Sequence, residues 1–216
     1  MKHKKSVNRS SFIEVIIDIL SRPLFNFLKK TSITANIITL CGALFGITGS
    51  LLFHFYENIS IKILAFILIF LYLTFDFIDG DIARYKKSMS KKGYALDIFF
   101  DKVIMILLLC VLYFKLDIID QINFINLILL FSPFYFQYIL KIFILMKDNL
   151  RSKINSNENI IILIYRKFFF PTHNNIIFII SLGILVNLFK ITFYFISALC
   201  IIAIIRQLYI IIKKIN

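Results

Sequence analysis

Long apolar runs, separated by short polar and basic segments, recur along most of the chain. A run of about 20 apolar residues is the length that an α-helix needs to cross the hydrocarbon core of a bilayer. The pattern therefore predicts an all-α membrane protein with six transmembrane helices. The predicted spans cover residues 35–56, 60–84, 93–115, 119–146, 174–189 and 191–212.

The first 30 residues follow a different pattern, in which a basic segment over 1–10 precedes polar residues at a helical period. The polar positions are Ser11, Glu14, Asp18 and Arg22, and the apolar positions opposite them are Phe12, Ile13, Ile16, Ile17 and Leu20. This spacing predicts an amphipathic helix that lies on the membrane surface. We therefore expect one domain over 1–216, with a basic N-terminus and interfacial helix over 1–30 and a six-helix bundle over 35–212.

Charge indicates how the predicted spans are oriented. The net charge is +13 although 60% of the residues are hydrophobic, and most basic residues lie in the first 30 residues, at the C-terminus and in the loops after the second and fourth spans. The opposite loops hold only Lys62, Lys115 and Lys190. By the positive-inside rule, both termini and the loop over 85–92 are predicted to be cytoplasmic. The excess charge then reflects topology and attraction to anionic lipids, so no nucleic-acid partner is expected.

Composition adds two smaller expectations. A bias toward Ile, Lys, Asn and Phe is typical of an AT-rich bacterial genome, so the expected location is the bacterial inner membrane. The cysteines Cys41, Cys110 and Cys200 each stand alone in an apolar run. We expect them to pack in the bundle rather than to bind metal or form disulfides.

Four aspartates interrupt the second and third predicted spans. Asp76 and Asp79 are three apart near the cytoplasmic end of one span, and Asp97 and Asp101 are four apart at the start of the next. Each pair shares a helical face, and the short loop between the spans places both pairs at similar depth. Carboxylates at this depth cost at least a few kcal/mol and repel one another. Bound Mg²⁺ or Mn²⁺ would remove that penalty, and two such ions are a known device of phosphoryl transfer.

Small residues lie beside the acidic positions. Gly80 and Ala83 leave room for a ligand near the backbone, and Arg84 can reach a phosphate from the same helix end. Gly93 stands one turn before Asp97. The sequence thus predicts a cavity suited to a diphosphate, while Asp81 is expected to be solvated.

The complete pattern is Asp-x-x-Asp-Gly-x-x-Ala-Arg over 76–84, eight residues, and Gly-x-x-x-Asp-x-x-x-Asp over 93–101. In every spacing it resembles the signature of the CDP-alcohol phosphotransferase, or phosphatidyltransferase, family. The six-span architecture and the interfacial helix resemble that family too. The resemblance implies that an acceptor alcohol attacks the β-phosphorus of a CDP-alcohol and releases CMP, in phospholipid or related phosphodiester synthesis.

The resemblance also implies roles for individual residues. It implies that Asp76, Asp79 and Asp97 hold two divalent cations, Mg²⁺ or Mn²⁺, and that Asp101 is the general base and a further metal ligand. The CDP group would be held by Gly80, Ala83, Arg84 and Gly93, and also by Asn36 and Thr39. Ala35 replaces a proline that is common in the family, and capping of a helix by Thr34 or Asn36 explains this segment equally well. A homodimer is implied by resemblance alone.

Several assignments stay open. The acceptor phosphate is expected at Arg206, Arg151 or Arg166, although snorkelling to the interface also explains the first of these. His173 is expected to line the cytoplasmic cavity, and capping of the fifth span or contact with the membrane interface explains it equally well. The donor is either CDP-diacylglycerol with a small soluble acceptor, or a soluble CDP-alcohol with a lipid or polar acceptor.

Two other function classes use membrane-embedded acids. An intramembrane prenyltransferase also grips a diphosphate through aspartates and magnesium, but it generally has two separated Asp-rich motifs in a longer bundle. A divalent-cation transporter is expected to place its acids near the centres of the spans and to have broken helices. The clustering of acids at one membrane face favours the transferase.

Overall fold

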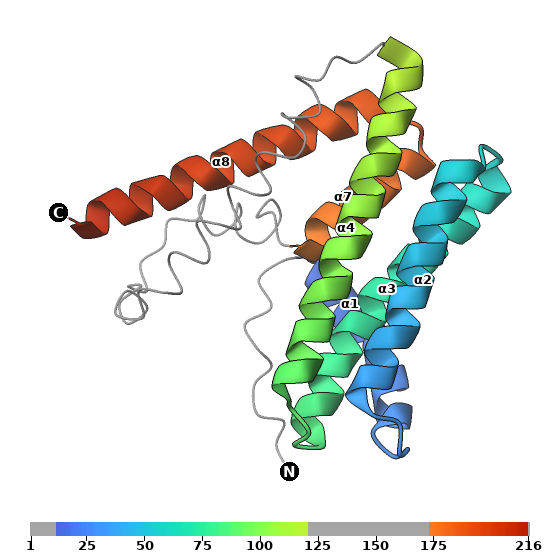
Figure 1. The fold of residues 1–216 in the computed structure, drawn as a ribbon, viewed down its shortest axis with the longest axis vertical. Coiled ribbons are helices and arrows are strands. Elements are labelled where there is room, and N and C mark those ends of the chain that lie inside the picture. The colour runs from blue at the N-terminus through green and yellow to red at the C-terminus, as the bar shows by residue number, and fades with distance from the viewer. Residues whose placement is uncertain (1–11, 121–172, 216) are drawn as a thin grey trace.

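The computed structural model describes residues 12–120 and 173–215, and all regular structure in these ranges is helical (Figure 1). The helices are α1 Phe12–Leu28, α2 Ala35–Phe55, α3 Ile59–Tyr85, α4 Lys91–Asp120, α7 His173–Leu185 and α8 Phe189–Ile215. The all-α prediction is confirmed for this part of the chain.

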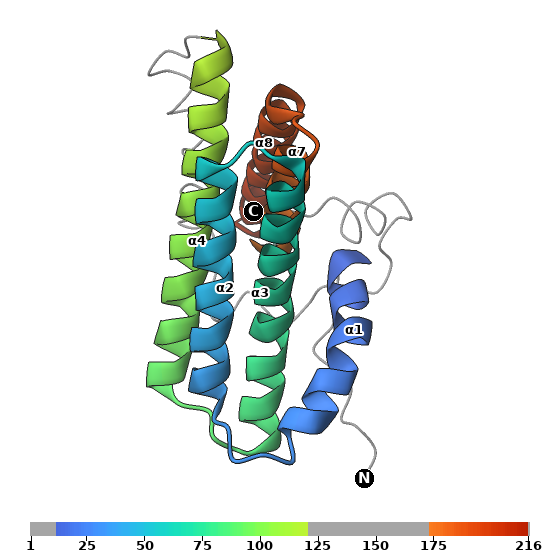
Figure 2. The same ribbon diagram turned by 90° about the vertical axis from the view of Figure 1, so that its right-hand side faces the viewer.

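Helices α2, α3 and α4 run side by side in alternating directions and form the main bundle (Figures 1 and 2). Helix α1 packs against α3, and α7 packs against α3 and α4. Helix α8 begins beside α7 and leads away from α2 and α3 (Figure 1). The core of the bundle is apolar and includes Phe53, Leu73, Ile104, Leu108 and Ile177.

The predicted helix bounds agree with α2, α3, α7 and α8 to within a few residues. Among the described helices, α2 and α3 are long and apolar enough to cross a membrane by themselves. Almost all of the predicted span over 119–146 lies outside the described residues, so the number of spans and the side of the termini remain predictions. The predicted end of the third span at residue 115 is wrong, because α4 continues through Lys115 to Asp120.

The N-terminal helix α1 is amphipathic, and only a narrow side of it is buried in the bundle. Ile17 is fully buried, and so is Ser21, whose hydroxyl donates to the Asp18 carbonyl at 2.9 Å. Arg22 pairs with the Asp18 carboxylate at 3.1 Å, as expected for the polar stripe. Leu20, predicted on the apolar face, is 54% exposed. Only part of the apolar surface of α1 therefore packs on the bundle.

Glycines along α2 allow it to lie very close to its neighbours. A Cβ atom on Gly42 would lie 2.9 Å from the Cβ of Phe75, and one on Gly49 would lie 2.9 Å from the Ala65 carbonyl oxygen. Gly46 faces Ile104 of α4 in the same way. Small residues at helix interfaces are the usual means of close packing in membranes. This approach brings the first turns of α2 against the ends of α3 and α4 that carry the aspartates.

Lys86 joins the turn between α1 and α2 to the end of α3. Its Nζ donates hydrogen bonds to the carbonyl oxygens of Thr31 at 2.6 Å and Ile33 at 2.7 Å. These carbonyls lie just before the start of α2 at Ala35. The hydrogen bonds therefore hold the first turn of α2 beside the end of α3.

At the opposite end of the bundle, two buried lysines share one glutamate. Lys62 is 2% exposed and Lys115 is 8% exposed. Glu57, in the turn between α2 and α3, accepts a hydrogen bond from Lys62 at 2.5 Å and another from Lys115. Lys62 also donates to Asn187 in the α7–α8 turn at 2.7 Å. Helix α4 can continue past the predicted end at residue 115 because the charge of Lys115 is paired with Glu57 inside the bundle rather than placed in water.

Replacing Glu57 tests this network. Glu57→Gln leaves two buried ammonium groups without an anion, and we expect the free energy of unfolding to fall by about 1–3 kcal/mol. The side chain of Glu57 is 64% exposed, so solvent screening keeps the loss below that of a fully buried pair. Thermal unfolding of the protein in detergent measures it, with Asp18→Asn on α1 as the control. Equal melting temperatures for the two variants would contradict the role of Glu57.

The same network predicts a dependence on pH. Partial burial alone would raise the pKa of Glu57, but hydrogen bonds and charge from Lys115 and Lys62 outweigh it, and the pKa lies below the usual 4.5. The stabilisation is therefore complete above about pH 4.5 and is lost as the pH falls through the pKa of the folded protein. Acid unfolding curves should show this loss in the wild-type protein and not in Glu57→Gln.

Candidate active site

The turn between α3 and α4 sets the depth of the aspartates. The N–H of Ser88 donates to the Ala83 carbonyl at 2.9 Å, and Lys87 adopts the left-handed conformation with φ 53°, so the chain reverses within a few residues. Asp76 lies nine residues before the end of α3, and Asp101 lies ten residues after the start of α4. At 1.5 Å per residue, both are about 14 Å from the turn. The expectation of similar depth is confirmed.

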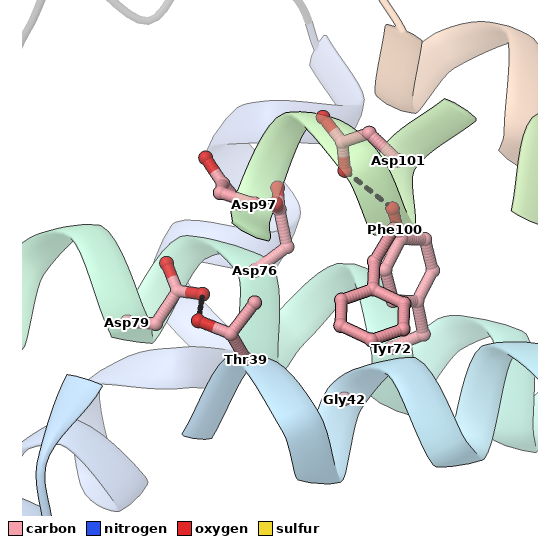
Figure 3. Close-up of a pocket in the computed structure, with 8 residues that line it drawn as sticks. All are labelled: Thr39, Gly42, Tyr72, Asp76, Asp79, Asp97, Phe100 and Asp101. Atoms are coloured by element: carbon pink, nitrogen blue, oxygen red, sulfur yellow. Dashed lines mark hydrogen bonds between the residues drawn. The ribbon is translucent and has the colours of Figure 1, made fainter. Parts of the chain in front are cut away.

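Three of the four carboxylates converge. Asp76, Asp97 and Asp101 each offer an oxygen atom, and these atoms lie within 4.8 Å of one another. These three aspartates line one pocket, which Figure 3 shows with its other lining residues. The full lining is Thr39, Gly42, Tyr72, Asp76, Asp79, Asp97, Phe100 and Asp101. Carboxylate oxygens are the ligands that Mg²⁺ and Mn²⁺ prefer, so these residues fit a divalent cation.

Asp79 lines the same pocket in a different environment. It is 5% exposed, and its Oδ2 accepts a hydrogen bond from the Thr39 hydroxyl at 2.5 Å (Figure 3). The oxygens of Asp79 are not part of the group of three. The structure therefore brings Thr39 of α2 into the pocket, as the sequence predicted, while a metal-ligand role for Asp79 stays a prediction.

Asp101 has two further neighbours. Its Oδ1 accepts a hydrogen bond from the Tyr72 hydroxyl at 2.6 Å, and Nε2 of His173 lies 3.3 Å from the same oxygen. Nε2 of His173 is also 3.3 Å from the Tyr72 hydroxyl oxygen. His173 stands beside Asp101 at the start of α7 but is not among the residues that line the pocket, so its role stays a prediction. Helices α3, α4 and α7 thus meet at this carboxylate.

The glycine and arginine of the first half-motif lie at the outer end of α3. The Arg84 guanidinium lies against Gly80, 3.3 Å from where a Cβ atom would stand. It donates to Asp81 at 2.6 Å and is 49% exposed. Asp81 is thus half-buried and paired rather than fully solvated as expected. An exposed pair of this kind is worth about 0–1 kcal/mol, so Arg84 can exchange partners easily.

Gly93 allows the starts of α2 and α4 to touch. A Cβ atom at this position would lie 2.8 Å from Oδ1 of Asn36. The N–H of Gly93 donates a hydrogen bond to the Ser90 hydroxyl oxygen at 3.0 Å, which caps the start of α4. Asn36 and Gly93, predicted to belong to one nucleotide site, are therefore neighbours, and Ala83 lies half-buried on the last turns of α3.

The three arginines predicted to bind the acceptor are not placed by this structure. Arg206 lies on α8, but its side chain is outside the described part of the protein, and Arg151 and Arg166 are outside the described residues altogether. Their role stays a prediction.

Sequence reasoning missed Tyr72, Gly42 and Phe100 as pocket residues. Tyr72 had a usable signal, because it lies four residues before Asp76 and so shares the acidic face of α3. Gly42 had a weaker one, as part of a run of small residues along α2. Phe100 had none, because only the packing of α4 determines which of its apolar residues border the pocket.

Comparison with known proteins agrees with the motif. The family model for CDP-alcohol phosphatidyltransferase matches residues 32–212. No curated protein matched the chain.

The convergence of carboxylates predicts cation binding by the purified protein. Asp97→Asn removes one of the three converging oxygens, and we expect it to weaken Mn²⁺ binding by at least about tenfold. Electron paramagnetic resonance of free Mn²⁺ measures the affinity. Asp81→Asn is the matched control, because Asp81 lies nearby but pairs with Arg84. Wild-type affinity in Asp97→Asn would show that the pocket is not a metal site.

Proposed function

Because the chain belongs to the CDP-alcohol phosphatidyltransferase family, whose model spans residues 32–212, we propose that it transfers a phosphatidyl or similar group from a CDP-alcohol to an acceptor alcohol. The observation that carries the proposal is the convergence of Asp76, Asp97 and Asp101 in one pocket. Asp79 and Thr39 line the same pocket. The family match favours this activity over the prenyltransferase and transporter alternatives.

In the proposed reaction, the hydroxyl oxygen of the acceptor attacks the β-phosphorus of the donor. A new P–O bond forms, the bond from that phosphorus to the bridging oxygen breaks, and CMP leaves with the bridging oxygen. Asp101 takes the proton of the attacking hydroxyl as general base. The position of its carboxylate, beside Asp76 and Asp97, supports this role.

Two divalent cations, Mg²⁺ or Mn²⁺, are proposed to be held by Asp76, Asp79, Asp97 and Asp101. When bound, they would neutralise the diphosphate and stabilise CMP as the leaving group. The role of the aspartates is to hold these cations in the pocket that they line. Thr39 supports the arrangement by holding Asp79 in one orientation through its hydrogen bond.

The CDP group is proposed to lie between the starts of α2 and α4 and the end of α3. Asn36, Thr39, Gly80, Ala83, Arg84 and Gly93 are the residues proposed to hold it. Two contacts support this placement: Asn36 adjoins Gly93, and the Arg84 guanidinium lies against Gly80. A phosphate can replace Asp81 as the partner of Arg84 with little loss, because that pair is half exposed.

The proposed setting is the bacterial inner membrane, with the pocket facing the cytoplasm and the chain acting as a homodimer. The two substrate plans are CDP-diacylglycerol with a soluble acceptor, and a soluble CDP-alcohol with a lipid or polar acceptor. Arg206, Arg151 and Arg166 are the candidates for binding a phosphorylated acceptor.

Release of CMP by the purified protein tests the proposal. We would supply Mg²⁺ or Mn²⁺ with CDP-diacylglycerol and, separately, with a panel of soluble CDP-alcohols, each with mixed acceptors. We expect one donor class to give metal-dependent CMP release. Asp101→Asn should lower the rate by at least about 100-fold, because it removes the general base.

Each outcome of the CMP-release assay leads to a different conclusion. The donor that yields CMP decides between the two substrate plans. Asp81→Asn should keep most of the activity, since its carboxylate faces Arg84 rather than the pocket. If the wild-type protein binds neither CDP nor metal, the proposed function is wrong.

A further inference from the structure

The carboxylate of Asp101 is held at one of its two oxygens. Its Oδ1 accepts the hydrogen bond from Tyr72 at 2.6 Å and lies 3.3 Å from Nε2 of His173. Among the described residues, Oδ2 accepts no hydrogen bond. Figure 3 shows the Tyr72 hydroxyl directed at one oxygen of Asp101 while the other points away from the ring.

We propose that Tyr72 and His173 are positioning residues for Asp101, which occupy Oδ1 and thereby present Oδ2 to the hydroxyl of the acceptor. This inference rests on the proposed function, in which Asp101 is the general base. It adds Tyr72 of α3 and His173 of α7, which both lie outside the signature motif over 76–101.

A carboxylate needs such a restraint because rotation about its last side-chain bond is nearly free. Rotamers at an sp³–sp² bond are broad, so an unrestrained Asp101 would present either oxygen over a range of directions. A general base must lie within hydrogen-bond distance of the proton that it removes. Fixing one oxygen converts a mobile group into one with a defined direction.

Tyr72 is well suited to impose this restraint. It is 3% exposed and belongs to the core of the bundle. Its ring lies against α2 at Gly46, where a Cβ atom would stand 3.1 Å from the ring carbon Cγ. The ring therefore has no room to swing, and the hydroxyl stays directed at Asp101.

His173 supplies the link to α7. It is the first residue of that helix, and its side chain is 19% exposed. Its Nε2 lies at the same distance from the Tyr72 hydroxyl oxygen as from the Asp101 carboxylate. Its Nδ1 is buried and has no hydrogen-bond partner among the described residues. The ring is thus turned toward Asp101 although that leaves its other nitrogen unsatisfied.

The test separates positioning from simple support of the fold. Tyr72→Phe removes only the hydroxyl, and we expect kcat to fall about 10- to 100-fold, as small misplacements of reacting groups do. The KM for the donor and the metal-dependent binding of CDP should change less than threefold. Tyr113→Phe is the control, since Tyr113 is partly buried on α4 and its hydroxyl makes no hydrogen bond within the described residues.

A second pair of variants tests His173. His173→Gln keeps an amide nitrogen that can reach Asp101, and His173→Leu does not. We expect the glutamine variant to retain most of the activity that the leucine variant loses, at similar melting temperatures. This rescue would not follow if the ring served only to fill space.

Three results would overturn the inference. The first is that the wild-type protein is active and Tyr72→Phe has the same kcat. This result would leave the proposed function intact. The second is a loss of CDP binding in Tyr72→Phe equal to its loss of kcat, which would show general damage to the pocket. The third is an absence of CMP release by the wild-type protein with every donor, which removes the proposed function as well.

Discussion

Mutual repulsion among carboxylates inside a helical bundle is the constraint on which the rest of the structure depends. Asp76, Asp97 and Asp101 approach within 4.8 Å at a depth where water cannot screen them fully. The tight turn between α3 and α4 brings the two helices together, and Thr39 and Gly42 of α2 complete the wall of the pocket. Hydroxyl donors relieve part of the repulsion, and a bound cation would relieve more. Ligands that bind only the folded state stabilise it, so a cation bound at this pocket would also stabilise the fold.

The bundle holds two clusters of charged side chains, one acidic and one basic, toward its opposite ends. The pocket end gathers acidic side chains between α3 and α4. The other end gathers Lys62 and Lys115 around the single carboxylate of Glu57. Both clusters join three or more segments of the chain, so each is a point at which helices are held in register. The apolar core between the two clusters provides most of the packing but does little to fix the register of the helices.

How far the sequence predicts this structure depends on the range of each interaction. Helical periodicity predicted that Asp76 shares a face with Asp79 and that Asp97 shares one with Asp101, and hydropathy predicted α2 and α3 to within a few residues. The end of α4 was misplaced because Lys115 is charged, and a charge within an apolar run is usually a boundary. Its partner, Glu57, lies in the turn between α2 and α3, 58 residues away along the chain, and no local pattern reveals that pairing. The convergence of Tyr72 and His173 has the same origin.

Residue roles divide in a similar way. The spacing of the signature is local along α3 and α4, so the family and the acidic pocket could be inferred before any coordinates. The orientation of each side chain is not local. Arg84 faces Asp81 rather than the pocket because a glycine leaves the guanidinium room to lie along its own helix. The spacing of the motif identifies residues such as Arg84 but does not predict the orientation of their side chains.

The two hydrogen bonds of Lys86 have a consequence for how α1 is coupled to the pocket. They join α3 to the turn that leads from α1 into α2, so a displacement of α1 would reach the first turn of α2 and Thr39. Within the part of the chain that the structure describes, the outer face of α1 is open, with Ile19 at 56% exposure and Phe27 at 66%. A contact on that face would therefore act on the Thr39–Asp79 hydrogen bond through the turn before α2, without touching any residue of the pocket.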